Sequence, residues 1–66
     1  MPPYEEWQLR VIEEKKELAD KLDKLCKFVA GEAFKALPAT QQNLLNRQWV
    51  HMKSYLDVLD ERIAAF

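Results

Sequence analysis

The feature that most constrains this chain is a line of apolar residues, alternately four and three positions apart, through its last third. It consists of Leu45, Trp49, Met52, Leu56, Leu59, Ile63 and Phe66. This spacing puts every member on one face of an α-helix, and such a face packs against another helix. The segment therefore predicts a long amphipathic helix over residues 39–65.

The first half of the chain repeats the same rhythm with one polar interruption. Its line is Val11, Lys15, Leu18, Leu22, Leu25 and Val29. No proline or glycine occurs between residues 4 and 30, and the composition there favours helix. We expect a first helix over 4–30, in which Lys15 either extends its ammonium to water or fixes the register of packing.

Gly31 and Pro38 bound the segment between the two predicted helices. Glycine is the natural stop for the first helix because it adopts the left-handed conformation without steric cost. Proline suits the first turn of the second helix. With a turn over 31–38, the sequence predicts one all-α domain over 1–66, an antiparallel two-helix hairpin.

A hairpin alone leaves many apolar side chains without cover. They include Trp7, Leu9, Ile12, Cys26, Phe28, Leu44, Val50, Tyr55 and Val58. Scattered surface apolar residues are normal, but burying one large side chain is worth about 1.5–3 kcal/mol, and a chain this short has a core worth only about 3–5 kcal/mol. We therefore expect a homo-oligomer, either a dimeric four-helix bundle or a larger ring, with Trp7, Ile12 and Trp49 at its interface.

Composition argues against several functional classes. A single cysteine and a single histidine, Cys26 and His51, form no recognisable metal motif, and no phosphate loop or nucleophile motif is present. The net charge of −1 is unfavourable for general binding to DNA, RNA or anionic membrane. We expect a cytoplasmic protein without cofactor or metal that is not an enzyme.

A second line on the last predicted helix carries polar and aromatic groups suited to a nucleotide. It consists of Leu44, Gln48, His51, Tyr55, Val58 and Arg62. A tyrosine ring stacks on a base and a guanidinium binds phosphate, although the same groups also line wet helix interfaces. Because the two ends of an antiparallel hairpin meet, Tyr4, Arg10 and Lys15 of the first helix should lie close to Arg62. The predicted ligand-binding residues are therefore Tyr4, Arg10, Lys15, His51, Tyr55 and Arg62.

Sequence runs in both halves resemble a family of small phage and prophage proteins related to a gene of a crAss-like phage. The first half carries the run from Arg10 to Leu18 and then Lys21 to Leu25, and the second half carries Leu44 to Gln48 and Glu61 to Ile63. The resemblance implies a viral accessory protein acting in the bacterial cytoplasm. Proteins of that kind include counter-defence factors that sequester cyclic nucleotide signals.

Two functional hypotheses follow from these observations. In the first, a non-enzymatic phage counter-defence protein, a homo-oligomeric sponge, binds a small anionic immune signal of the cyclic nucleotide type. In the second, the protein inhibits a host or defence protein through an exposed apolar helical face that includes Trp7 and Trp49. RNA binding, as in plasmid-encoded helical hairpin dimers, is a third reading, and the near-neutral charge argues against it.

Overall fold

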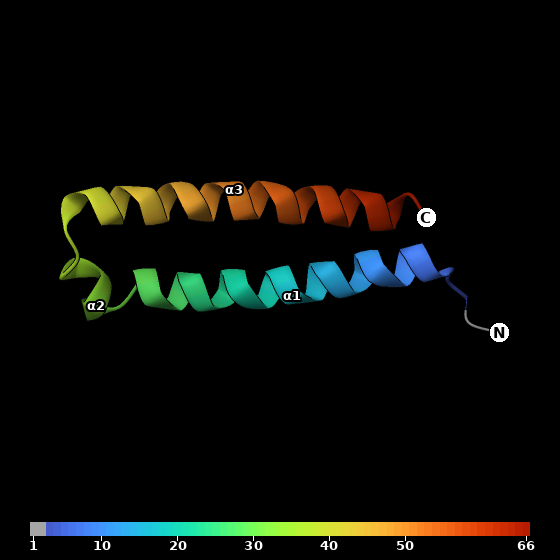
Figure 1. Ribbon diagram of the computed structural model, residues 1–66, viewed down its shortest axis with the longest axis horizontal. Coiled ribbons are helices and arrows are strands. Elements are labelled where there is room, and N and C mark those ends of the chain that lie inside the picture. The colour runs from blue at the N-terminus through green and yellow to red at the C-terminus, as the bar shows by residue number, and fades with distance from the viewer. Residues whose placement is uncertain (1–2) are drawn as a thin grey trace.

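Two long helices and one helical turn make up the computed structural model, which describes residues 3–66. They are α1 (Glu6–Val29), α2 (Glu32–Lys35) and α3 (Ala39–Ala64). No strand occurs in this range, so the predicted all-helical class is confirmed. Helices α1 and α3 lie side by side and antiparallel (Figure 1). The start of α1 and the end of α3 therefore meet at what we call the open end, and α2 lies at the opposite turn end.

The start of α1 is fixed by a local hydrogen bond. The backbone N–H of Glu5 donates to Oε1 of Gln8 at 2.7 Å, which ties the residue before the helix to its first turn. The helix begins at Glu6, two residues later than the range expected from the sequence, and ends at Val29.

Gly31 does not end α1 in the way the sequence predicts. Its φ is −94°, and no residue in the described range has a positive φ. Instead, Ala30 closes α1 in the right-handed conformation, with its N–H donating to the Cys26 carbonyl at 3.1 Å. The reason is that α2 starts immediately, so the chain needs an extended residue before it, and Gly31 takes that role.

The turn end is held to α3 by the side chain of Gln42. Its Nε2 donates to the carbonyl oxygens of Leu37 at 2.8 Å and Lys35 at 3.3 Å. Pro38 precedes α3 in an extended conformation, and the Gln42 N–H donates to the Pro38 carbonyl at 3.1 Å. These bonds satisfy carbonyl groups that a short turn would leave unpaired.

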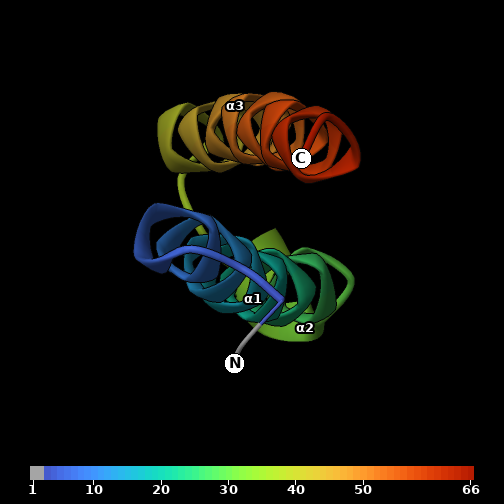
Figure 2. The ribbon, with the colours of Figure 1, turned by 90° about the vertical axis from the view of Figure 1, so that its right-hand side faces the viewer.

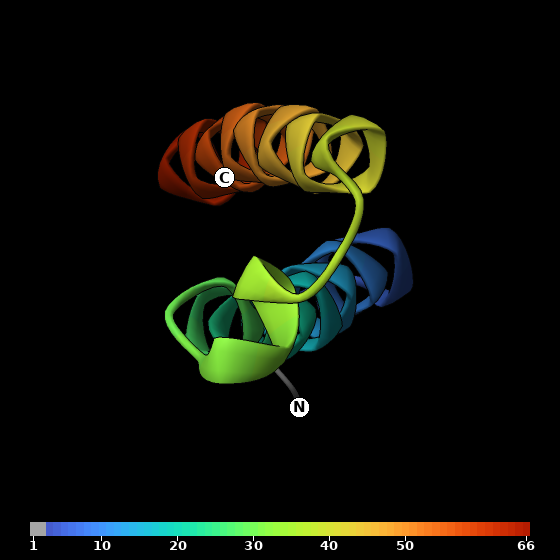
Figure 3. The same cartoon turned by 90° about the vertical axis from the view of Figure 1, so that its left-hand side faces the viewer.

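The core is a single seam between α1 and α3. Val11, Leu18 and Leu22 of α1 are buried, and Leu59 of α3 is only 1% exposed. The partly buried residues packed against this core are Met52, Leu56 and Ile63 of α3 and, after the helix, Phe66. The two end-on views show α1 and α3 as one pair, and residues 3–66 form no third layer over either side of it (Figures 2 and 3).

The molecule is elongated for its size. Its Cα radius of gyration is 15.3 Å, against about 11 Å for a compact domain of this length. Its accessible surface is 5184 Å², whereas about 4400 Å² is typical of a compact monomer of 7.8 kDa. Neither long helix has, in the described range, an apolar stretch sufficient to cross a bilayer.

Candidate functional site

The hairpin has two lateral sides that differ in chemistry. We call the two apolar lines of the sequence, one on each long helix, the seam residues. Positions directly after them, such as Cys26 and Asp60, point to one side of the hairpin. Positions directly before them, such as Tyr55 and Arg62, point to the other side. Two observed contacts, Lys15 with Asp60 and Trp49 with Cys26, identify the first side. We call it the paired side, and its opposite the stripe side.

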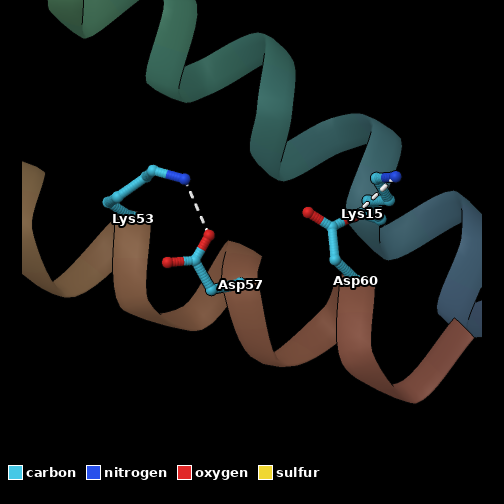
Figure 4. Close-up of polar contacts among 4 residues, drawn as sticks. All are labelled: Lys15, Lys53, Asp57 and Asp60. Carbon is cyan, nitrogen blue, oxygen red and sulfur yellow. Dashed lines mark hydrogen bonds and ion pairs between the residues drawn. The ribbon is translucent and has the colours of Figure 1, made fainter. Parts of the chain in front are cut away.

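The paired side carries charges that neutralise one another. Lys15 Nζ lies 2.6 Å from Oδ1 of Asp60, which joins α1 to α3 (Figure 4). One helical turn away, Lys53 Nζ donates to Oδ1 of Asp57 at 2.7 Å. This hydrogen bond and the negative charge of Asp57, with a smaller contribution from Asp60, raise the pKa of Lys53 above its ordinary value of 10.5. Lys15 therefore serves the packing of the two helices.

A tryptophan and the lone cysteine also meet on the paired side. Trp49 Nε1 donates to Sγ of Cys26 at 2.9 Å, and Trp49 remains 36% exposed. Cys26 is exposed and forms no disulfide. Ile12, on the same side, is half-buried. Two of the three predicted interface residues, Ile12 and Trp49, thus share this side with the ion pairs.

Aromatic rings gather at the open end. Phe66 contacts Tyr4 and Trp7 edge-on, with ring centroids 6.0 Å and 5.3 Å apart. Arg10 Nη2 lies 2.7 Å from Oε1 of Glu6, one turn earlier in α1, and both side chains are largely exposed. The positive charge of Arg10 is therefore partly countered within its own helix.

The stripe side presents an exposed line of side chains on α3. We call it the α3 stripe, and it consists of Leu44, Gln48, His51, Tyr55, Val58 and Arg62, each of them exposed. The stripe has no acidic member, and Arg62 takes part in no ion pair within residues 3–66. An exposed guanidinium, an imidazole and a phenol ring on one face can bind an anion that also has a flat ring.

Helix α1 adds a second line to the stripe side, exposed except at the half-buried Glu14. Its residues are seven apart and consist of Trp7, Glu14, Lys21 and Phe28. Trp7 is 51% exposed and Phe28 is 40% exposed. Arg10 lies three residues after Trp7 and so projects toward the same side. The stripe side thus combines apolar surface with the basic groups of both helices.

Four of the six predicted ligand-binding residues fall on one side of the hairpin, by their positions directly before seam residues. Arg10, His51, Tyr55 and Arg62 share the stripe side, Tyr4 packs on Phe66 at the open end, and Lys15 lies on the paired side. The sequence analysis missed Asp60 as the partner of Lys15. Its position directly after seam residue Leu59, at the level of Lys15 in an antiparallel pair, was the available signal.

Neither a cavity nor a metal cluster is formed by the part of the chain that the structure describes. Residues 3–66 enclose no pocket, and no three side chains of His, Cys, Asp or Glu converge there. The groups of the α3 stripe are therefore exposed to solvent and lie in no pocket of the described residues.

The chain is similar to known proteins over almost its entire length. The Sequestin family model matches residues 5–65. The chain is also 42% identical over 60 residues to the 7.5 kDa protein of the denB-rIIB intergenic region of Enterobacteria phage T4, covering 91% of this chain and 94% of the relative. No solved structure matches. The finer resemblance to a crAss-like phage gene stays a prediction. This chain belongs to the Sequestin family, a family of small phage proteins.

Proposed function

We propose that this protein is a non-enzymatic phage counter-defence factor whose homo-oligomer sequesters a small anionic ligand of the cyclic nucleotide class in the host cytoplasm. The family name supports sequestration, and the relative in phage T4 supports a viral role. The ligand class is inferred from the chemistry of the α3 stripe.

The observation that carries the proposal is that Tyr55 and Arg62 both belong to the α3 stripe, an exposed line with no acidic member. They are two helical turns apart, about 10 Å along α3. The phenol ring offers a stacking surface for a base, and the guanidinium offers two parallel donors to a phosphate. His51 lies one turn before Tyr55 and adds a further donor or acceptor on the same face.

Sequestration by an oligomer also fits the shape of the single chain. A ligand on the stripe of one hairpin is open to water, since every member of the stripe is exposed. Covering the stripe with a second copy buries the ligand and strengthens its charged hydrogen bonds, because the local dielectric falls. Tight binding by this protein therefore requires more than one chain.

Native mass spectrometry with a panel of bacterial cyclic nucleotides and ADP-ribose derivatives tests the proposal. We expect a discrete oligomer that gains a fixed number of ligands. Arg62→Ala and Tyr55→Ala should each weaken binding, whereas Lys16→Ala, which removes an exposed cation outside the stripe, should not. An oligomer that binds no compound of the panel contradicts the proposed ligand class.

A second candidate function is inhibition of a host or defence protein through an exposed apolar face. It is favoured by Trp7, which is 51% exposed despite its size. Tryptophan is enriched among residues that dominate the energy of protein interfaces. If Trp7→Ala abolishes protection of the phage while nucleotide binding is unchanged or absent, this second function is the correct one.

A further inference from the structure

A second set of exposed residues borders the α3 stripe. Arg47, Ser54 and Glu61 are seven residues apart, so they lie in one line along α3. All three are exposed, and within residues 3–66 neither Arg47 nor Glu61 takes part in an ion pair. The two opposite charges stand at equal distances on either side of a small residue.

The α3 stripe has the same symmetry. Its spacing of four, three, four, three and four reads identically in both directions, and its centre falls at position 53, one residue before Ser54. A helix with such a line pairs naturally with an antiparallel copy of itself about a two-fold axis. In that register, His51 of one chain meets Tyr55 of the other, and Gln48 meets Val58.

We propose that a second copy of this chain docks on the α3 stripe, antiparallel and about a two-fold axis that passes next to positions 53 and 54. Arg47 then pairs with the partner subunit's Glu61, and the axis repeats the pair. In a parallel arrangement the edges that carry Arg47 and Glu61 would lie on opposite sides of the interface, so the two chains could not form this pair. Only the antiparallel register gains the two opposite-charge pairs, so charge complementarity favours it.

The accessible surface of the single chain is large enough to contain an interface of standard size. Its 5184 Å² exceeds the value typical of a compact monomer by about 800 Å², which is close to the area that each partner buries in a standard interface. Leu44, Tyr55 and Val58 are between 44% and 50% exposed in one chain. Docking on this face would remove these apolar groups from water.

The two-fold axis also places the open end of each hairpin next to the turn end of its partner. The open end of one chain, with Tyr4 and Trp7 against Phe66, comes to the level of the partner's turn end. The turn end carries its own aromatic pair, Phe28 and Phe34, with ring centroids 6.4 Å apart. Aromatic surface therefore meets aromatic surface at both ends of the dimer.

This arrangement deepens the proposed function, on which its account of the ligand site rests. Arg62 is at one end of the stripe and Leu44 is at the other, so Arg62 lies at the level of the partner's Leu44. Each end of the dimer then has an arginine from one chain and the start of α3 from the other. The ligand site, between Tyr55 and Arg62 of one chain and the partner's His51 and Leu44, is therefore incomplete in a single chain and occurs twice in the dimer.

Charge reversal at the two bordering positions tests the pairing directly. Native mass spectrometry and sedimentation should show that Arg47→Glu and Glu61→Arg each raise the dimer dissociation constant about tenfold or more, because each puts like charges opposite each other. Mixing the two variants should restore assembly as a heterodimer of distinct mass. Equal or weaker association of the mixture would overturn the antiparallel register.

A matched pair of valine substitutions tests which face is covered. Val58 belongs to the stripe and is 50% exposed, whereas Val50 points elsewhere on the same helix and is 53% exposed. Val58→Asp should give a helical monomer, and Val50→Asp should keep the wild-type mass. The reverse result would overturn the interface. The assembly is measured without ligand, so a dimer that binds no nucleotide refutes the proposed ligand class and leaves the interface standing.

Discussion

Lys15 and Asp60 form an ion pair across the hairpin, with Nζ 2.6 Å from Oδ1. Lys15 occupies a seam position where its neighbours along α1 are buried valine and leucine. Its aliphatic stem packs in the seam while its ammonium reaches the edge, where both charged side chains remain almost half exposed. The pair thus ties α1 to α3 on the paired side without burying a charge.

A double-mutant cycle at Lys15 and Asp60 should give a modest coupling energy. We expect about 0.2–1 kcal/mol from thermal or urea unfolding of Lys15→Met, Asp60→Asn and the double variant. Water screens the two charges, which sets the upper limit. A coupling energy of zero would mean that the ion pair does not contribute to the stability of the fold in solution.

Leu59 should be the most sensitive single position for stability. At 1% exposure it is the most buried side chain of the core. The substitution Leu59→Ala should lower the free energy of unfolding by about 2–5 kcal/mol. This equals most of the stability that a core of this size provides, so the variant should lose its cooperative helical unfolding transition by circular dichroism. Val50→Ala, at 53% exposure, is the control and should change stability by less than about 0.5 kcal/mol.

The contact between Trp49 and Cys26 should be visible in fluorescence. Cys26 is exposed, so a small alkylating reagent should modify it in the folded protein. The modification displaces the sulfur that accepts the Trp49 N–H, and in a Trp7→Phe background the remaining emission should shift. In a Trp49→Phe background the emission of Trp7 should stay the same. An equal shift in both backgrounds would point to a change of the whole fold.

Stability should fall at high pH through the loss of lysine charges. The pKa values of Lys27 and Lys53 are raised above 10.5 because each donates a hydrogen bond to an aspartate one turn earlier or later. A raised pKa in the folded state means that the contribution is complete below 10.5 and is lost as the pH rises through the folded-state value.

The measurement is the difference in melting temperature between the wild type and Lys53→Met. The difference should be present near about pH 8 and should close once the pH exceeds the raised folded-state pKa of Lys53, where both proteins lack the charge. Because Lys53 is on the surface, added salt should reduce the difference at the lower pH. A difference independent of pH would assign the effect to packing of the side chain.

The sequence predicted the elements of the fold because apolar periodicity is a strong local signal. The lines through Leu18 and Leu59 contain all four buried residues of the core. The predicted left-handed conformation of Gly31 was wrong, because a glycine after a helix can either end it in the left-handed conformation or precede another helical turn in an extended one. Only the neighbouring chain decides between these, and here α2 does so.

The candidate site was less accessible to sequence reasoning. Spacing alone placed His51, Tyr55 and Arg62 on one face, since a heptad fixes which positions share a side. It did not place Lys15 against Asp60, because long side chains select among many rotamers and partners. The proposed pairing of Arg47 with the partner's Glu61 could be recognised only after the contacts of the structure had distinguished the stripe side from the paired side.

The central claim is that this protein holds its ligand without transforming it, and a binding-and-release assay tests that claim most directly. The protein is incubated with a cyclic nucleotide from the panel, filtered to remove free ligand, and then heated to unfold it. We predict that the nucleotide disappears from the first filtrate and returns chemically intact after heating, and that Arg62→Ala loses this retention. Recovery of a cleaved nucleotide, or no retention of any compound in the panel, would contradict the claim.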